Sequence, residues 1–392
     1  MAALMATWTA PARAQEDVRA LWVVRTTLTS PAAVSRMVDV ARASGFNTLV
    51  VQVRGRGDAY YRGGLEPPPV ALTTEPRFDP LAATIARAHD AGLRVHAWIN
   101  VNLVASAVDP PVAREHVIYR HPEWLMVPRA LGAGLATVDP HSPEYLGRLS
   151  RYVRAQSSDI EGLYLSPIPA GAVEYTASVV RDIVSRYAVD GVHLDYVRYP
   201  SADFDYSRAA LDAFAWEVNR DLPRADPYRR RLAREPLVYT EAFPERWRAF
   251  RTARLTALLA RLRDVVKSAR PAATVSVAVG PDAGAAAADR LQDWGAWATS
   301  GLVDVICPMA YTADAATFSS QIAAAREVAG STPLWAGIGA FRLSSAQIVD
   351  DIGRARRLGV RGIILFSYDS LTAPSRGADD LTQLGRALAS DQ

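Results

Sequence analysis

The sequence predicts an α/β fold in which eight parallel strands close into a (β/α)8 barrel, the TIM barrel. The first observation is a unit that recurs along the 392 residues: an amphipathic helix, usually a glycine and then a short apolar stretch. With Ala20–Arg25, which precedes the first unit, the apolar stretches number eight. The second is that these stretches are apolar throughout rather than at alternate positions, which is typical of parallel strands covered on both faces. The third is that no G-x-G-x-x-G motif follows the first strand, which disfavours a doubly wound open sheet.

Start and stop signals for helices mark the units in chain order. Ser30-Pro31 combines an N-cap with a proline at the first helical position, and the helix that it opens ends at Gly45. Asp79-Pro80 and Gly92 delimit the next helix in the same way. Further helices are predicted at Val173–Tyr187, Arg248–Ser268, Leu291–Ser300, Phe318–Val328 and, after a Ser344/Gln347 capping box, up to Gly359. The predicted strands are Ala20–Arg25, Asn47–Val53, Leu93–Ile99, Val192–Val197, Ala273–Val279, Leu302–Met309, Pro333–Gly339 and Arg361–Phe366.

Two connections are much longer than a single helix requires. About ninety residues separate Ile99 from Val192, and a second insert of roughly Ser201–Glu245 follows the fourth strand. We expect the first insert to contain a helix near Pro143–Ala155 and a short strand near Leu163–Ser166. Both inserts follow the carboxyl ends of strands, where barrel enzymes place their active sites. They are therefore predicted to form lids or cleft walls.

The N-terminus predicts export. Residues Ala2–Ala10 are small and mostly apolar, and Ala12-Arg13-Ala14 before Gln15 is an A-x-A pattern suited to a signal peptidase, although a basic segment is missing. We expect residues 1–14 to be a signal-peptide remnant, residues 15–392 to form a single catalytic domain, and the protein to be periplasmic or extracellular. An alanine-rich N-terminal arm is the alternative. No other apolar run approaches the roughly 20 residues that span a bilayer, so no integral membrane segment is predicted.

Composition excludes several other classes of function. The net charge of +3 is small and its arginines are spread along the chain, so nucleic acid is not an expected partner. The single cysteine, Cys307, precludes an intrachain disulfide and is expected in the core. None of the six histidines stands in an H-x-x-x-H spacing, so no metal and no cofactor is predicted.

The fourth predicted strand is the most informative stretch of the chain. His193 and Asp195 are two residues apart and share a strand face, whereas Val192 and Leu194 point the other way. Burying a histidine and a carboxylate on one face costs several kcal/mol unless they are paired or solvated. Asp195 at the carboxyl end of a barrel strand is therefore predicted to belong to an active site. A structural carboxylate paired with an arginine is the alternative, and His193 is more consistent with an orienting role than with proton transfer.

Polar and aromatic side chains gather at the other strand ends. Aromatic faces flanked by hydrogen-bonding groups suit the alternating CH and OH surface of a sugar, and no glycine-rich phosphate loop is present. Arg54 and Arg56 have a structural alternative, because they can hold their loop together. The residues predicted to bind substrate are Arg25, Gln52, Arg54, Trp98, Asn100, His193, Arg198, Tyr199, Tyr311 and Tyr368.

Several segments resemble the glycosyl hydrolase-like 10 family of bacterial (β/α)8 proteins. They are Arg19–Val23, Gln52–Ala59, Val95–Asn100, His121–Trp124, Asp190–Pro200, Asp304–Tyr311 and Leu334–Gly339. The resemblance implies an exported glycoside hydrolase that acts on a bacterial envelope or extracellular glycan, with peptidoglycan strands lacking stem peptides as one associated substrate. The chain departs from the family pattern at Leu163–Pro167, where a strand followed by Asp-Pro is common.

Glycoside hydrolysis normally needs two carboxyl groups. Asp195 is predicted to be the nucleophile or transition-state stabiliser, kept ionised by Arg198 or another arginine. Asp58 and Glu241 rank first as its partner, although Asp58 can simply cap a turn. The other acidic residues that follow strands are Asp282, Asp314 and Asp369. Two alternatives remain open: a carbohydrate-binding barrel without catalysis, and a barrel enzyme of another class such as an isomerase or lyase.

Overall fold

The structure is a computed structural model that describes residues 17–389 except 107, 225, 233 and 378–379. The predicted signal-peptide remnant, residues 1–14, lies outside the described residues. The main sheet has eight parallel strands in the order β8-β7-β6-β3-β2-β1-β10-β9. Parallel bridges from Ile306 to Leu334 and from Met309 to Gly337 join its two edges and bring the barrel close to closure. The predicted (β/α)8 fold is confirmed.

The barrel strands are β1 (Arg19–Val23), β2 (Thr48–Arg54), β3 (Arg94–Asn100), β6 (Gly191–Asp195), β7 (Thr274–Val279), β8 (Val305–Pro308), β9 (Trp335–Gly339) and β10 (Gly362–Phe366). These are the eight predicted strands, with ends that differ by up to three residues. The largest differences arise where an apolar run continues past the hydrogen-bonded ladder, as before Val305.

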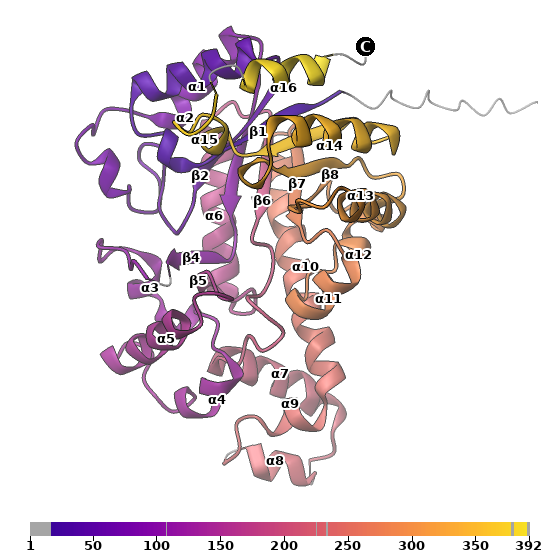
Figure 1. The fold of residues 1–392 in the computed structure, drawn as a ribbon. Helices are drawn as coiled ribbons and strands as arrows, with labels where there is room; N and C mark the ends of the chain where they lie inside the picture. The colour runs from indigo at the N-terminus through magenta and orange to yellow at the C-terminus, as the bar shows by residue number, and fades with distance from the viewer. Residues whose placement is uncertain (1–16, 107, 225, 233, 378–379, 390–392) are drawn as a thin grey trace, which may run out of the picture.

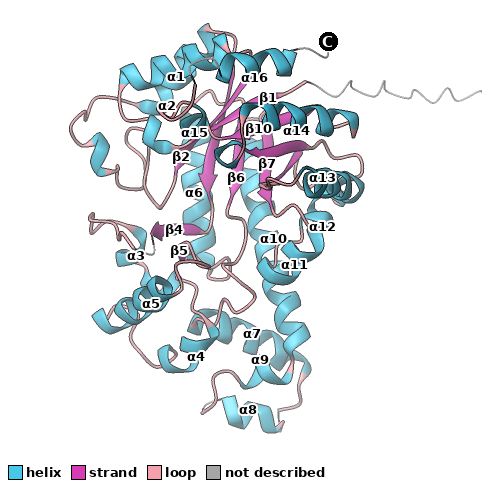
Figure 2. Cartoon of the chain, in the orientation of Figure 1, coloured by secondary structure: helices cyan, strands magenta, loops and turns pink. Residues whose placement is uncertain are grey.

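Helices surround the strands (Figure 2). They are α1 (Pro31–Ala43), α2 (Pro80–Asp90), α6 (Ala170–Arg186), α10 (Pro244–Ala269), α11 (Ala283–Arg290), α12 (Trp294–Thr299), α13 (Ala315–Ala329), α14 (Ser345–Arg357), α15 (Tyr368–Leu371) and α16 (Asp380–Ala389). The predicted start signals hold: the Ser30 hydroxyl accepts from the amide of Ala33 at 3.2 Å, and Asp79 accepts from that of Ala82 at 3.0 Å. Gly45 and Gly92 have φ of 77° and 72°, a conformation that glycine adopts without steric cost.

The remaining elements lie at the carboxyl ends of the barrel strands (Figure 1). Between β3 and β6 the chain forms β4 (Leu103–Ser106), α3 (Val117–Arg120), α4 (Arg129–Leu135), α5 (Pro143–Ala155) and β5 (Gly162–Tyr164), and β4 pairs antiparallel with β5. Between β6 and α10 it forms α7 (Arg208–Asp221), α8 (Pro227–Leu232) and α9 (Val238–Ala242). The short 3-10 helices are η1 (Arg25–Thr27), η2 (Val70–Leu72), η3 (Pro122–Trp124) and η4 (Ala340–Arg342).

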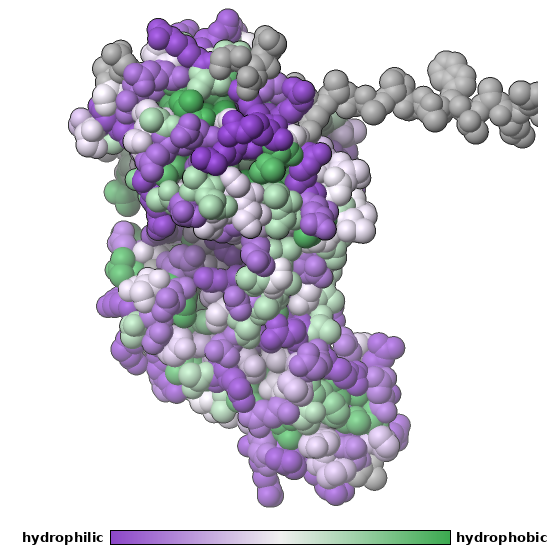
Figure 3. All heavy atoms as spheres, turned by 45° about the vertical axis from the view of Figure 1, so that its right-hand side comes forward, coloured by the Kyte–Doolittle hydropathy of each residue, from purple (hydrophilic) through white to green (hydrophobic). Residues whose placement is uncertain are grey.

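The long helix α10 connects the barrel to the helices α7, α8 and α9 (Figure 1). It contacts α9 at one end and packs beside α6 against the barrel at the other (Figure 1). Phe214 on α7 and Trp247 and Phe250 on α10 belong to a separate apolar cluster that α7, α9 and α10 form together. On the face drawn in Figure 3, apolar side chains lie among hydrophilic ones. Within the described residues, no helix combines the length and apolar character needed to cross a membrane.

The barrel interior has its own apolar cluster, separate from the one between strands and helices. Trp22, Trp98 and Trp335 belong to the inner cluster, and Val192 and Leu194 belong to the outer one. This alternation confirms that His193 and Asp195 share the inward face of their strand, because their neighbours Val192 and Leu194 point outward. Cys307 lies in the inner cluster, as expected.

Candidate active site

Strand register sets the depth of each candidate residue inside the barrel. On β6, His193 lies beside Trp98 of β3 on one side and Ser276 of β7 on the other. Asp195, at the end of β6, lies beside Asn100 at the end of β3. Asp195 therefore stands one level closer to the barrel mouth than His193. This is the side on which the connections from β3 to β6 and from β6 to α10 lie.

His193 is fully buried and hydrogen-bonded through both ring nitrogens. Its Nε2 accepts from the indole of Trp22 at 3.0 Å, and its Nδ1 lies 2.9 Å from the Ser276 hydroxyl. Because an indole N–H only donates, Nε2 is unprotonated and Nδ1 carries the proton. Burial and the neighbouring His96 lower the pKa of His193 to about 3. A neutral ring held on both sides orients its neighbours and does not shuttle protons near neutral pH.

Asp195 is almost completely buried, at 6% exposure, and is held by two donors. Its Oδ1 accepts from the amide of Tyr196 at 2.6 Å and from Nη1 of Arg198 at 3.2 Å. Burial raises the pKa of the Asp195 carboxyl, and Arg198 and the Tyr196 amide oppose that rise. Tyr196 has φ of 54°, in the left-handed region that a residue with a Cβ rarely adopts. Strain of this kind is common at functional sites and requires support from the surrounding structure.

A cavity of about 230 Å3 opens over Asp195. Seven predicted site residues line it: Arg25, Gln52, Trp98, Asn100, Asp195, Arg198 and Tyr311. Seven further residues complete its wall: Trp22, Val24, Arg56, Leu103, Tyr196, Met309 and Phe366. The Tyr311 and Phe366 rings stack with centroids 5.6 Å apart, and the Trp98 indole nitrogen is buried without a hydrogen-bond partner among the described residues. Aromatic faces with polar groups at their edges therefore surround the carboxylate.

A second cavity, of about 310 Å3, contains Asp58 and shares two residues with the first, Arg25 and Arg56. Asp58 Oδ1 accepts from the amides of Gly55 and Arg56 at 3.2 and 2.8 Å. The turn-capping alternative for Asp58 is thus observed, and the same side chain also lines a cavity next to Asp195.

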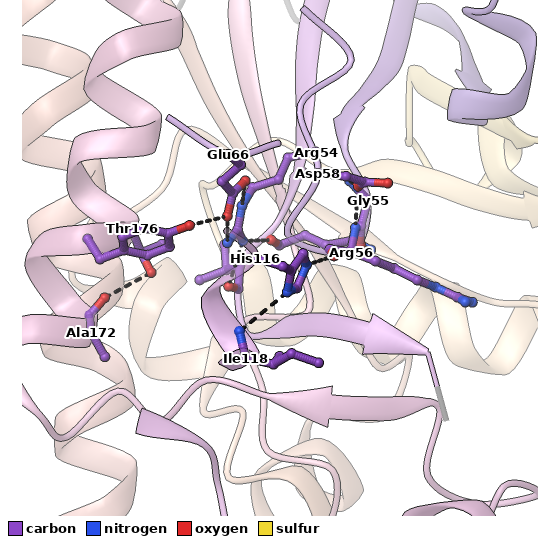
Figure 4. Close-up of polar contacts among 12 residues, drawn as sticks. Arg54, Gly55, Arg56, Asp58, Glu66, His116, Ile118, Ala172 and Thr176 are labelled. Carbon is purple, nitrogen blue, oxygen red and sulfur yellow. Dashed lines mark hydrogen bonds and ion pairs between the residues drawn. The ribbon is translucent and has the colours of Figure 1, made fainter. Parts of the chain in front are cut away.

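Other predicted site residues lie outside both cavities. Arg54 is fully buried and forms a two-pronged pair with Glu66, with N···O distances of 2.7 and 2.6 Å (Figure 4). The Arg54 guanidinium also donates to the carbonyls of Asn100 and Val101, so it ties the loop after β2 to the end of β3. The hydroxyl of Tyr199 donates to the carbonyl of Arg251. Tyr368 is buried in α15, and His193 lies beneath the cavity floor.

The predicted partner acids are widely separated in the structure. Glu241 on α9 is about half exposed and pairs with Arg129 at 3.4 Å. Asp282 and Asp314 cap α11 and α13, and both Asp369 oxygens accept hydrogen bonds, one from the Val24 amide. Among the described residues, Asp195 is the one carboxylate that lines its own cavity.

Glu161, which directly precedes β5, is an acidic residue that the sequence did not single out. Its Oε2 accepts from the Tyr164 hydroxyl at 2.7 Å, and the Tyr164 ring packs edge-on against Tyr196, 6.1 Å between centroids. The negative charge of Glu161 is among the smaller influences that raise the pKa of Asp195. No pattern in the sequence marks this residue, because a connection of irregular structure brings it to the barrel mouth.

Strand parity would have found some of the missed wall residues. Trp22 and Phe366 occupy inward positions near the ends of β1 and β10, so counting alternate residues along each strand places them in the barrel. Tyr196 lies in a loop, where no such periodicity applies. For Arg56, also in a loop, the sequence indicates only a residue that can hold its loop together.

The chain is similar in sequence and in fold to known proteins. The model of the family described as Glycosyl hydrolase-like 10 matches residues 17–334, most of the chain. The chain is 26% identical to Glycosyl hydrolase DigH of Escherichia coli K12 over 70% of its own length and 56% of that protein. It is 24% identical to Glycosyl hydrolase YngK of Bacillus subtilis over 49% of its own length and 37% of that protein. The chain thus spans about half or less of the length of these curated relatives.

Solved structures support the fold. The glycoside hydrolase domain of PgaB (BpsB) from Bordetella bronchiseptica superposes with a TM-score of 0.66, at 15% identity, over 95% of this chain and 99% of that one. The catalytic domain of a β-amylase from Paenibacillus polymyxa superposes with a TM-score of 0.60, at 10% identity, over 96% and 99%.

The family match covers the barrel strands through β8 together with the residues around Asp195. It confirms the resemblance found in the sequence. The chain belongs to the glycosyl hydrolase-like 10 family.

Proposed function

We propose that this protein hydrolyses the glycosidic bonds of a bacterial envelope or extracellular polysaccharide, with peptidoglycan glycan strands as the first substrate to test. The observation that carries the proposal is Asp195 itself. A buried carboxylate at the end of the fourth barrel strand, 3.2 Å from an arginine, stands in a cavity lined by aromatic rings and amide groups. The two relatives, named glycosyl hydrolases, support the reaction class.

In the proposed mechanism Asp195 acts on the anomeric carbon. The reaction passes through a transition state with oxocarbenium character, whose positive charge an ionised Asp195 stabilises or captures covalently. Arg198 and the Tyr196 amide keep the carboxylate ionised and fix its orientation, because both bond Oδ1. Oδ2 is then the oxygen that faces the sugar.

A second carboxyl group supplies the proton to the leaving oxygen. Asp58 is our first candidate, since it lines the neighbouring cavity and its bonded Oδ1 leaves Oδ2 available. Glu161 is a second candidate because its charge acts on Asp195. Glu241 was predicted from its position after a strand, and its carboxylate pairs with Arg129 at the surface.

The test is release of reducing ends from purified peptidoglycan glycan strands and from a panel of polysaccharides. We expect the wild type to release them and Asp195→Asn to lose roughly three orders of magnitude or more of the rate, as when a principal catalytic group is removed. Equal rates for the two proteins would remove Asp195 from the mechanism. Binding of a glycan without hydrolysis by the wild type would instead support a carbohydrate-binding barrel.

We also propose that the protein is exported. The A-x-A pattern at residues 12–14 supports this proposal. Expression with its own N-terminus, followed by fractionation and N-terminal sequencing, should yield a mature chain that begins at Gln15. A full-length chain confined to the cytoplasm would contradict the proposal.

A further inference from the structure

Two guanidinium groups, those of Arg25 and Arg56, stand at the boundary between the two cavities and line both. Arg25 donates to Gln52 Oε1 at 3.0 Å. Within the part of the chain that the structure describes, the Arg56 guanidinium has no hydrogen bond, and neither arginine forms an ion pair with a carboxylate. By contrast Arg54 pairs with Glu66 and Arg198 pairs with Asp195. Asp58 and Asp109 line the second cavity and their charges oppose the lowering of the Arg56 pKa, but among the described residues no ion pair joins either aspartate to Arg25 or Arg56. The boundary therefore presents two cations that no carboxylate contacts directly.

The backbone at Arg56 is fixed from both sides. Its amide donates to Asp58 at 2.8 Å, and its carbonyl accepts from His116 Nε2 at 2.8 Å (Figure 4). His116 is contributed by the segment between β3 and β6, so two separate parts of the chain hold one residue in place. Gly57 allows this arrangement, since its φ is 69° and a Cβ there would approach His116 Nε2 to 2.6 Å. Figure 4 shows the Arg56 side chain extending away from this network.

The charges around Asp195 are unequal. Three arginines but one aspartate line that cavity, and Arg198 is the partner of the aspartate. Burial and the nearby positive charge of Arg25 lower the pKa of Arg56, so the protein itself disfavours the two charges at this position. A neutral substrate that displaced water from the two guanidinium groups would increase the free-energy cost of burying their charges. A substrate with a negatively charged group beside them would offset that cost.

We propose that Arg25 and Arg56 bind a carboxylate carried by a sugar of the substrate, so that the enzyme acts on an acidic rather than a neutral glycan. The inference rests on the proposed function and makes Arg25 and Arg56 determinants of its specificity. A guanidinium is planar and presents paired N–H donors that match a carboxylate. Prolines 67–69, 110 and 111 and the exposed Val70 and Val112 wall the second cavity, where they can cover the apolar face of an adjoining sugar ring.

Two kinds of sugar could supply the carboxylate. One is N-acetylmuramic acid, whose lactyl ether ends in a free carboxylate when no peptide is attached. The other is a uronic acid, whose carboxylate is attached directly to the ring. The shared chemistry is a carboxylate within reach of the boundary, and the two sources differ in the length of the linkage.

The experiment measures binding by calorimetry, with every protein carrying Asp195→Asn so that ligands are not consumed and any effect of that substitution cancels. The ligands are a peptide-free N-acetylglucosamine–N-acetylmuramic acid tetrasaccharide, the same compound with its lactyl carboxyls converted to methyl amides, an oligouronide, and an N-acetylglucosamine tetramer. The added substitutions are Arg56→Gln, Arg56→Lys and, as the matched control, Arg151→Gln, which removes an exposed arginine on α5.

We expect at least one carboxylated ligand to bind about 10- to 100-fold more tightly than the neutral ones, the range for a hydrogen-bonded charge pair. Arg56→Gln should abolish this preference, Arg56→Lys should retain part of it, and Arg151→Gln should leave it unchanged. Preference for the lactyl or the uronic compound identifies the source of the carboxylate.

Equal affinity of the Asp195→Asn protein for the acidic tetrasaccharide, its amide and the oligouronide would overturn the inference. This comparison does not depend on whether an Arg56 variant folds. Equal weakening of all ligands by Arg56→Gln would also overturn it, because the arginine would then have a structural role. If the Asp195→Asn protein binds neutral ligands as tightly as acidic ones, and the wild type hydrolyses both equally well, the proposed function stands and the inference falls. Absence of binding and of hydrolysis for every glycan would overturn both.

Discussion

The indole N–H of Trp22 donates a 3.0 Å hydrogen bond to Nε2 of His193 across the inside of the barrel. Their strands, β1 and β6, are not neighbours in the sheet, since β3 and β2 lie between them. The bond therefore fixes the imidazole in one tautomer directly beneath Asp195, together with the Ser276 hydroxyl on β7. This arrangement supports the orienting role over proton transfer for His193.

The buried neutral state of His193 predicts a pH dependence of stability. Its pKa is about 3 in the folded protein, against about 6.5 for an unperturbed histidine, so the unfolded state binds the proton more tightly. The free energy of unfolding should therefore fall as pH decreases from about 6.5 towards 3, with a limiting slope of about 1.4 kcal/mol per pH unit from this group. Urea denaturation at a series of pH values measures the slope. His193→Gln should show a shallower decline, and an identical slope in both proteins would contradict the assigned protonation state.

Arg198 should control the pH at which the enzyme becomes active. The Asp195 carboxyl must be ionised to act on the anomeric carbon, and burial already raises its pKa while Arg198 opposes that rise. Arg198→Gln removes the opposing charge, so the acidic limb of the profile of kcat/KM against pH should move to higher pH. Arg198→Lys keeps a positive charge and should move it less. An acidic limb that stays in place in Arg198→Gln would show that Asp195 does not set it.

The buried pair of Arg54 and Glu66 should be essential for stability. Both side chains are fully buried, and the Tyr175 hydroxyl also donates to Glu66 at 3.0 Å. Glu66→Gln leaves an unpaired buried guanidinium and should lower the free energy of unfolding by about 3–5 kcal/mol. The control is Asp39→Asn, which breaks an exposed ion pair with Arg87 and should cost less than about 1 kcal/mol. Similar losses for the two variants, measured by urea denaturation, would contradict the structural role of Arg54.

The identity of the acid can be tested with two kinds of substrate. A general acid is needed to expel a sugar but hardly to expel a nitrophenolate. We expect Asp58→Asn to slow hydrolysis of the glycan by roughly 10²–10⁴-fold and that of an aryl glycoside far less. Asparagine retains an oxygen that can accept from the Gly55 and Arg56 amides, so the loop should stay in place.

Glu161→Gln and Glu241→Gln are assayed beside it. The same selective loss in Glu161→Gln, with Asp58→Asn unaffected, would transfer the role to Glu161. The same loss in Glu241→Gln would support the sequence-based prediction that Glu241 is the catalytic acid. It would also require α9 to move towards the Asp195 cavity.

Periodic elements were predictable because their signals are local. Ser30 and Asp79 cap the helices that they were expected to cap, and the run around His193 and Asp195 shows which residues of β6 face inward. Seven of the predicted site residues line the Asp195 cavity because parallel strands of a closed barrel end at one rim. Arg54 and Tyr199 are also an arginine and a tyrosine near strand ends, as are Arg198 and Tyr311 in the cavity wall. Arg54 and Tyr199 are buried, however, and their hydrogen bonds hold them outside the cavity.

The sequence by itself determined the barrel, the family and the position of Asp195 at the end of the fourth strand. The barrel and the position of Asp195 follow from periodicity, capping and strand parity, which depend only on residues close together in the chain. The family follows from the resemblance of several segments to its members. Only the tertiary structure decided which arginines have partners: Glu66 pairs with Arg54, while Arg56, two residues later, is held through its backbone by Asp58 and His116 and keeps an unpaired guanidinium. The physical reason is that pairing depends on contacts between loops, which have no repeating pattern, and on burial, which is a property of the packed molecule.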